Sequence, residues 1–565
     1  MPYHGPPPPR PPNTPEEVVI TWEAAERILP EKANLGIDLP RAPNTTGTPR
    51  HRLVTIGDSL THGFKNFAIS DTEHSWPAIV AYELGWLEHF RRPEYEGPAV
   101  CKGLPLNLYD LVARMEAAAH GKKHIIGWAR MVWSLLSTML EVKRYWQSGP
   151  GSKTPVNGPF NHNLAIYGWD LRDAMSKDVE WCDDSIRGRH RRVRAARKRP
   201  RRKRGNPIKT FLLWLGAKAL GRLVISHPNE IAARMVLWGD GNPKNTQLIA
   251  AKALGDEGTE ESKTGESDGI ETLVVALGSN NALKTVVYLN LAWSKDGMFK
   301  DLDAKDQYTI WRPTHFKEEL DELVTRVREI HARHVIWSSI PHVTIVPLAH
   351  GVGEKPYYSR YFPRYTYVVI PDSEFDGNVD PMISADEART VDSVIDSYNA
   401  MIRVAVAQAR SDSKDWYYFD ACGLLDSMAY RRYLENPRPR PRPRGWKPYD
   451  FPNEFNSITP FPDTRFITSD HKGAMTGGLI GLDGVHPTTL LYGIVAQEII
   501  KVMELAGVQF KHPDGSPRSG PVKVEWSRLI EAEPLVQKPL KTLGEILGVV
   551  GELMERIDLG RFLFS

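Results

Sequence analysis

The chain has 565 residues, and its 72 Lys and Arg residues nearly balance its 69 Asp and Glu residues, so the formal net charge is only +3. Three cysteines (Cys101, Cys182 and Cys422) exclude a disulfide framework, and they lack the spacing of metal ligands. No stretch reaches the roughly 18 uncharged apolar residues of a transmembrane helix. Residues 1–15 are rich in proline and lack the apolar core of a signal peptide. We therefore expect a cytoplasmic protein.

The first expected strand covers residues 52–56, which are apolar and rich in β-branched side chains. The tetrapeptide Gly-Asp-Ser-Leu at 57–60 follows it directly, and its glycine allows a sharp turn. A helix is expected near residues 75–80, where Ser75 can cap its start. Ser59 is then at the carboxyl end of a strand, where open α/β sheets place their ligands.

Two later apolar runs also close on small polar turns. Residues 163–168 read Asn-Leu-Ala-Ile-Tyr-Gly, and residues 272–277 form a run typical of a buried parallel strand. The second run ends in Gly-Ser-Asn-Asn at 278–281. The backbone N–H of Gly168 and the side-chain amide of Asn281 are donors of the kind that stabilise an oxyanion, although each segment alone is more typical of an ordinary strand-to-loop turn.

The second half of the chain predicts two further strands and a long helix. Residues 335–341 and 415–420 are apolar and rich in β-branched and aromatic side chains, which favours strands. Residues 391–409 between them have helical periodicity. The expected strands and helices thus alternate along the chain.

A general base for the serine is found near the end of this pattern, in Leu-Asp-Gly-Val-His-Pro at 482–487. Asp483 and His486 are three residues apart, a spacing that suits a tight turn in which the carboxylate accepts the Nδ1 proton of the imidazole. The other ring nitrogen then faces a hydroxyl, as nucleophilic catalysis by serine requires. The alternative is a loop with a turn aspartate and a helix-capping histidine.

Together and in this order, these segments resemble the GDSL, or SGNH, hydrolases, a family of esterases and lipases. The resemblance covers four of the blocks of sequence that define the family, and Asn281 takes the place of the usual Asp in the third. The matching residues are Gly57 to Leu60 in the first block, Asn163, Ala165 and Gly168 in the second, Gly278 and Asn280 in the third, and Asp483, His486 and Pro487 in the fifth.

The resemblance implies a fold and a catalytic triad. The fold would be a three-layer α/β/α sandwich with a central parallel sheet, flavodoxin-like, here carrying long insertions. Ser59 would be the nucleophile, His486 the general base and then acid, and Asp483 the residue that orients the imidazole. The chemistry would be hydrolysis of an ester of unknown acyl chain through an acyl-serine, with no metal or cofactor. An acyltransferase with the same triad is the alternative.

The resemblance also implies an oxyanion hole. Its donors would be the backbone amides of Ser59 and Gly168 and the side-chain amide of Asn280. The family pattern selects Asn280, whereas the residues alone do not separate it from its neighbour Asn281.

The spacing of the blocks predicts one enlarged domain. We expect a largely disordered, proline-rich extension over 1–50, the hydrolase domain over 51–507, and a C-terminal extension with an amphipathic helix over 508–565. The insertions are expected near 87–159, 186–269, 346–389 and 436–477.

One of these insertions is strongly basic, because residues Arg187 to Arg204 include twelve Lys or Arg and no acid. An amphipathic segment at 208–224 follows, and a basic run beside such a segment is typical of binding to an anionic membrane surface. A peripheral membrane location is therefore the alternative to a cytoplasmic one. Nucleic acid is a less favoured partner because the block has few aromatic residues. A solvated insertion without a partner, or a catalytically silent hydrolase fold that binds through this block, is also compatible with the sequence.

Overall fold

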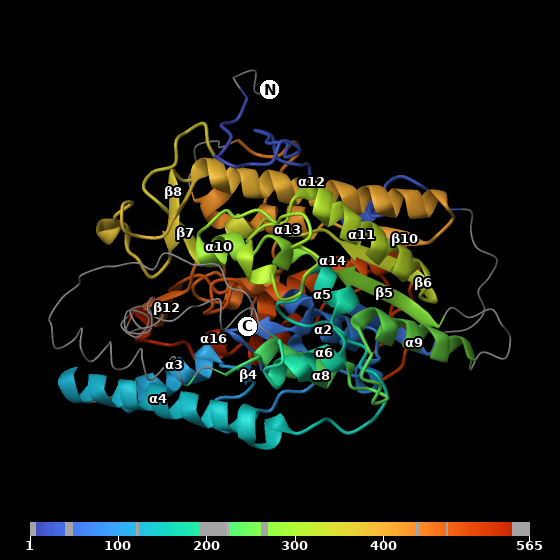
Figure 1. The fold of residues 1–565 in the computed structure, drawn as a ribbon, viewed down its shortest axis with the longest axis horizontal. Helices are drawn as coiled ribbons and strands as arrows, with labels where there is room; N and C mark the ends of the chain where they lie inside the picture. Colours follow the sequence, from blue (N-terminus) through green and yellow to red (C-terminus); the bar gives the residue numbers. More distant parts are fainter. Residues whose placement is uncertain are drawn as a thin grey trace.

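The computed structural model describes most of the chain (Figure 1). Three predicted features fall on the remaining residues: nearly all of the basic block, the amphipathic segment after it except Leu223, and the C-terminal amphipathic helix from residue 545 on. Within the described part, no helix is both long enough and apolar enough to cross a membrane. The described residues are 7–39, 49–119, 124–190, 223, 225–260, 269–435, 441–470, 473–512 and 514–544.

A parallel sheet of four strands forms the centre of the molecule. Its strands are β1 (His51–Gly57), β5 (Ile270–Ala276), β6 (Ala332–Ser338) and β10 (Trp416–Phe419), in the order β1-β5-β6-β10. All three pairings are parallel. The predicted α/β class, the central parallel sheet and the four predicted strands are confirmed.

The segment that begins at Asn163 extends this sheet beyond β1. Asn163 forms a parallel bridge with Thr55, and the N–H of Leu164 donates to the Thr55 carbonyl at 2.9 Å. The N–H of Ile166 donates to the carbonyl of Gly57 at 3.1 Å. With this segment counted second along the chain, the spatial order of the five segments is 2-1-3-4-5.

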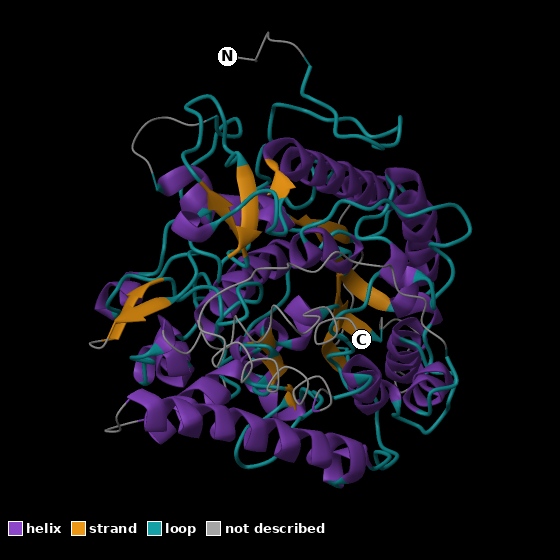
Figure 2. Cartoon of the chain, turned by 60° about the vertical axis from the view of Figure 1, so that its left-hand side comes forward, coloured by secondary structure: helices purple, strands orange, loops and turns teal. Residues whose placement is uncertain are grey.

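Side chains from the strands enter separate hydrophobic cores on the two faces of the sheet. Leu273 and Val275 of β5 belong to one core, and Val274 between them belongs to the other. Burial on both faces explains why these strands are continuous apolar runs. Figure 2 shows helices on both sides of the central strands. The main helices are α9 (Gln247–Glu260), α11 (Pro313–Arg328) and α12 (Ala385–Ser411) in the first core, and α2 (Trp76–Glu83), α13 (Ala421–Met428) and α14 (Thr489–Leu505) in the second.

The predicted helices are present, but the start of α2 differs in detail from the prediction. Ser75 occupies the N-cap position, yet its hydroxyl donates to the Thr72 carbonyl at 2.7 Å and does not cap the helix. Gly63 has φ +90°, and a Cβ there would lie 2.7 Å from Cβ of Ser75. Glycine is therefore needed where α1 (Ser59–His62) ends against this turn.

The other elements lie between or around these. The helices are α3 (Leu108–Ala119), α4 (His124–Ser148), α5 (Leu171–Ser176), α6 (Val179–Ile186), α8 (Pro228–Leu237), α10 (Lys284–Tyr288), α15 (Trp526–Ala532) and α16 (Pro534–Gln537). Two antiparallel sheets consist of β2 (Phe64–Lys65), β3 (Ala68–Ile69) and β4 (Leu104–Pro105), and of β7 (Ala349–Val352), β8 (Arg364–Tyr367) and β9 (Ile383–Ser384). A hairpin joins β11 (Thr468–Asp470) to β12 (Gly473–Thr476).

Residues 7–39 lie against the core around the central sheet. The N–H of Ile28 donates to the Asp420 carboxylate at 2.8 Å, just beyond β10. Arg27 forms an ion pair of 2.9 Å with Glu498 of α14, whose side chain is buried. The proline-rich composition does not predict this docking, because it depends on partners 392 and 471 residues away in the sequence.

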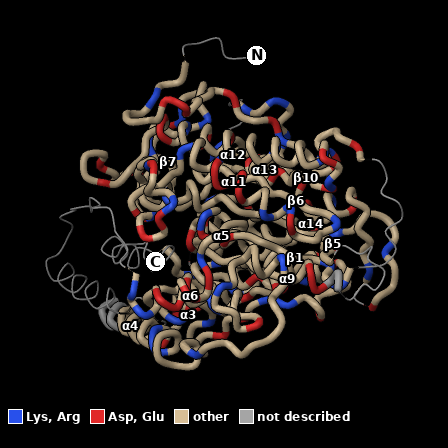
Figure 3. Tube along the Cα trace, turned by 45° about the vertical axis from the view of Figure 1, so that its right-hand side comes forward, with Lys and Arg blue, Asp and Glu red and all other residues tan. Residues whose placement is uncertain are grey.

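Basic and acidic residues are intermingled along the described chain (Figure 3). The first residues of the basic block follow this pattern, since Arg187 and Arg189 pair with Asp183 and Asp184 of α6 at 3.8 and 2.7 Å. The start of the block is therefore partly neutralised by the helix that precedes it.

We expect Gly57→Ala to destabilise the turn that carries Ser59. A Cβ at Gly57 would lie 2.4 Å from Oγ1 of Thr61, whose side chain is fully buried and cannot move aside. Overpacking of this kind lowers the free energy of unfolding by about 1–3 kcal/mol. The control is Gly158→Ala, because a Cβ there meets no heavy atom within 4 Å. Chemical denaturation measures both variants, and an equal loss in the two would contradict the account.

Candidate active site

The turn after β1 presents Ser59 at the carboxyl end of the sheet. Asp58 precedes the short helix α1, and its side chain accepts the N–H of Leu60 at 3.1 Å. Burial raises the pKa of Asp58 to about 6, and the hydrogen bond from Leu60 opposes this shift. The Asp58 side chain thus fixes the first turn of α1, and Ser59 is its first residue.

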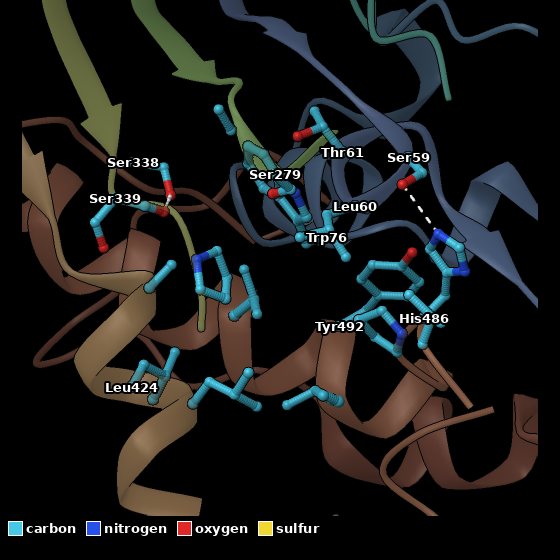
Figure 4. Close-up of a pocket in the computed structure, with 18 of the residues that line it drawn as sticks. Ser59, Leu60, Thr61, Trp76, Ser279, Ser338, Ser339, Leu424, His486 and Tyr492 are labelled. Carbon is cyan, nitrogen blue, oxygen red and sulfur yellow. Dashed lines mark hydrogen bonds between the residues drawn. The ribbon is translucent and has the colours of Figure 1, made fainter. Parts of the chain in front are cut away.

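Ser59, His486 and Asp483 form a continuous hydrogen-bonded series. Oγ of Ser59 lies 3.0 Å from Nε2 of His486, and Nδ1 of His486 lies 3.2 Å from Oδ2 of Asp483. Figure 4 shows the serine hydroxyl pointing at the imidazole. With the proton of the neutral ring on Nδ1, donated to the carboxylate, Nε2 is free to accept the proton of the hydroxyl. All three residues are buried.

Backbone donors hold the Asp483 carboxylate in place. Oδ1 accepts the N–H groups of Val485 and His486, each at 2.8 Å, and Oδ2 accepts the N–H of Phe67 at 2.8 Å. Burial acts to raise the pKa of Asp483, but the imidazole of His486 and the hydrogen bonds outweigh it and hold the pKa below its usual range. The carboxylate therefore stays ionised and is able to stabilise a positively charged imidazole.

The loop that supports Asp483 contains residues that the sequence does not reveal as part of the site. Asn66 and Phe67 have φ values of +51° and +67°, a region that residues other than glycine rarely adopt. Oδ1 of Asn66 accepts the N–H of Leu482 at 2.8 Å. The ring of Phe64 lies 4.5 Å from that of His486, measured between centroids. Asn is tolerant of positive φ, which is the only signal of this turn in the sequence.

The second block of the resemblance lies beside the turn that carries Ser59. The side chain of Asn163 binds across to it, because Nδ2 donates to the Thr61 carbonyl at 3.0 Å and Oδ1 accepts the hydroxyl of Thr55 at 3.1 Å. Gly168 closes the block with φ +75°. Asn163 is therefore a structural tie between the first two blocks.

The third block contacts the second. Nδ2 of Asn280 donates to the carbonyl of Trp169 at 2.7 Å, so this amide lies next to the residue after Gly168. Asn281 is fully buried, and neither side-chain polar atom has a hydrogen-bond partner among the described residues. An unpaired buried amide is unfavourable. The side-chain amide of Asn281 is able to donate to a ligand, whereas that of Asn280 already donates to Trp169. Both asparagines stay candidates for the oxyanion donor.

Buried charges fix the turn that follows Gly168. Asp170 and Asp173 form a capping box at the start of α5, in which the N–H of Asp173 donates to Asp170 at 3.0 Å. Asp173 also pairs with Lys177 at 2.9 Å and with Lys305. Burial would raise the pKa of Asp173, but the two lysines hold it well below its usual range.

One cluster outside this site contains metal-ligand types. His342, Asp396 and Cys422 have ligand atoms within 4.8 Å of one another. However, Nε2 and Nδ1 of His342 already contact the carboxylates of Asp396 and Asp426 at 3.1 and 3.2 Å. Burial acts to lower the pKa of His342, but Cys422 and the carboxylates of Asp392, Asp426 and Asp396 together keep it well above its usual value. Burial raises the pKa of the Cys422 thiol to about 12. A charged imidazole between two carboxylates describes this cluster better than a metal site.

Comparisons of the chain with protein-family models, with curated proteins and with solved structures find no match. The chemistry open to the site therefore follows from its own side chains. A hydroxyl, an imidazole and an ionised carboxylate in series, with amide groups close by, are suited to acyl transfer.

We expect substitutions of Asn66 to separate backbone strain from hydrogen bonding in the loop that holds Asp483. Asn66→Ala leaves the N–H of Leu482 without its acceptor and keeps the strained φ, so the free energy of unfolding should fall by about 2–3 kcal/mol. Asn66→Gly loses the same hydrogen bond but relieves the strain, so it should be about 1 kcal/mol less damaging.

The matched control for this loop is Asn13, which is exposed and has φ +61°. Asn13→Ala and Asn13→Gly test the strain alone by chemical denaturation. If Asn66→Ala is no more destabilising than Asn13→Ala, the hydrogen bond to Leu482 does not support the loop.

Proposed function

We propose that the protein is a serine hydrolase of the SGNH type that cleaves carboxylic esters through an acyl-serine intermediate. The observation that carries the proposal is the hydrogen-bonded series from Ser59 through His486 to Asp483. Ser59 and His486 are separated by 427 positions, yet their reactive atoms lie 3.0 Å apart. A serine needs such a base to become a nucleophile at neutral pH.

In the proposed mechanism, Nε2 of His486 takes the proton of Ser59 as Oγ attacks the ester carbonyl carbon. The tetrahedral intermediate carries its negative charge on the former carbonyl oxygen, which accepts hydrogen bonds from the oxyanion hole. As it collapses, His486 gives the proton to the departing alcohol. A water molecule, deprotonated by His486, then attacks the acyl-serine, and the carboxylic acid leaves as Oγ recovers its proton.

The architecture supports the SGNH assignment. The order 2-1-3-4-5 is that of doubly wound flavodoxin-like sheets, in which ligands bind outside the carboxyl ends of the strands. The first and third blocks follow the carboxyl ends of β1 and β5, two neighbouring strands of this sheet. The second block runs alongside β1. All three are therefore at the position where such a fold places its active site.

We expect Ser59→Ala to lower kcat for hydrolysis of a short-chain p-nitrophenyl ester by about 10⁶-fold, because the acyl-serine can then no longer form. Ser411→Ala, an exposed serine on α12, is the matched control and should keep full activity. His486→Ala should fall as far as Ser59→Ala, and the double variant no further, since triad members act as a unit. Unchanged activity of Ser59→Ala would exclude the proposed function.

Alanine substitutions of the two asparagines should identify the side-chain donor of the oxyanion hole. Loss of one such donor lowers kcat about 10²–10³-fold and leaves KM nearly unchanged. The resemblance predicts this result for Asn280→Ala. Asn281→Ala is the matched control, and its kcat should change little. A reversed result would assign the role to Asn281, and two unaffected variants would exclude an asparagine from the oxyanion hole.

A further inference from the structure

The backbone N–H of Gly168 is a buried donor without a partner. Gly168 is buried, and its N–H meets no hydrogen-bond acceptor among the described residues. Buried N–H groups in proteins are nearly always paired, so an unpaired one calls for an explanation. A donor that is kept free for a developing oxyanion is such an explanation, and the oxyanion hole that the resemblance implies includes this N–H.

The direction of this N–H is set by the peptide that joins Tyr167 to Gly168. The peptide is trans and planar, so its C=O and its N–H point in opposite directions. Nδ2 of Asn229 donates to the Tyr167 carbonyl at 3.0 Å. Asn229 therefore holds the same peptide from the side opposite to the Gly168 N–H.

This peptide is one that can turn over unless it is held. Gly168 has φ +75°, and glycine adopts positive and negative φ about equally well. A turned peptide would direct the Tyr167 carbonyl, an acceptor, to the place of the N–H. It would also leave the buried amide of Asn229 without this acceptor, which is unfavourable.

The preceding peptide is held from α1, the helix that begins at Ser59. The N–H of Tyr167 donates at 3.2 Å to Nδ1 of His62, the last residue of α1. Burial lowers the pKa of His62 to about 3, so the ring is neutral and its proton is on Nε2. Nε2 lies 3.0 Å from the hydroxyl oxygen of Tyr95, which donates in turn to the carbonyl of Ala232 at 3.2 Å.

We propose that Asn229 and His62 are positioning residues of the oxyanion hole, which hold the Tyr167–Gly168 peptide so that its N–H faces the oxyanion. The inference rests on the proposed function, because the oxyanion forms only when Ser59 attacks an ester. Neither residue belongs to the blocks that carry the resemblance. Since the hydrogen bond to the oxyanion is made only in the transition state, loss of either residue should lower kcat and leave KM nearly unchanged.

The first test is the hydrolysis of p-nitrophenyl acetate by Asn229→Leu. Its kcat should fall about 10–10²-fold, less than for outright loss of an oxyanion donor, because the N–H remains in the chain. Asn245→Leu is the matched control, since Asn245 is also buried and its Nδ2 donates to the carbonyl of Leu237 in α8, the helix that contains Asn229. This control should keep its kcat, and chemical denaturation should show that both variants are folded.

Two substitutions of His62 separate positioning from packing, and they decide the matter if Asn229→Leu does not fold. His62→Phe fills the buried site but offers no acceptor to the Tyr167 N–H, so its kcat should fall. In His62→Asn, Oδ1 takes the place of Nδ1, so most of the kcat should return. The reverse order, with His62→Phe the more active variant, would assign His62 a packing role alone.

An alkyl trifluoromethyl ketone provides a readout without turnover. Oγ of Ser59 adds to its carbonyl carbon while His486 takes the proton, and the carbonyl oxygen becomes an oxyanion. Inhibition of Asn229→Leu should weaken by the same factor as its kcat, and undiminished inhibition would overturn the proposal. If Asn229→Leu and His62→Phe keep full kcat, the positioning role is wrong and the triad stands, whereas an unmodified protein that hydrolyses no ester would exclude the proposed function itself.

Discussion

The hydrogen bond between Ser59 and His486 is the contact on which the account of this protein depends. It joins the turn after β1 to a loop that comes just before α14, and β5, β6 and β10 lie between these two segments in the sequence. Because parallel strands present their carboxyl ends at one edge, the segments between the strands can be long without displacing this contact. Long connections and a compact site are therefore compatible in one chain.

A base is useful only when it is oriented, and here the orientation depends on burial. The Asp483 carboxylate is removed from water, but three backbone N–H groups and the imidazole compensate for that loss. One of these donors belongs to Phe67, in a backbone conformation that is unfavourable for its residue type. Strain of this kind persists where the surrounding structure enforces it, and it is concentrated at functional sites.

The sequence predicts the sheet and the triad because both are encoded locally. Each strand is a continuous apolar run, and Asp483 and His486 are three residues apart. What the sequence does not predict depends on distant partners. Whether Asn280 or Asn281 is the oxyanion donor depends on how each amide lies relative to the second block, and both stay candidates. The positive φ of Phe67 depends on the loop around Asp483, and the docking of Ile28 depends on Asp420.

Covalent labelling with a fluorophosphonate tests the central claim most directly, because this reagent reacts with a serine that a neighbouring base has activated. Peptide mass spectrometry should locate the adduct on Ser59 in the unmodified protein, and His486→Ala should abolish it. A stable, folded protein that remains unlabelled, or an adduct on another serine, would contradict the assignment of Ser59 as the nucleophile.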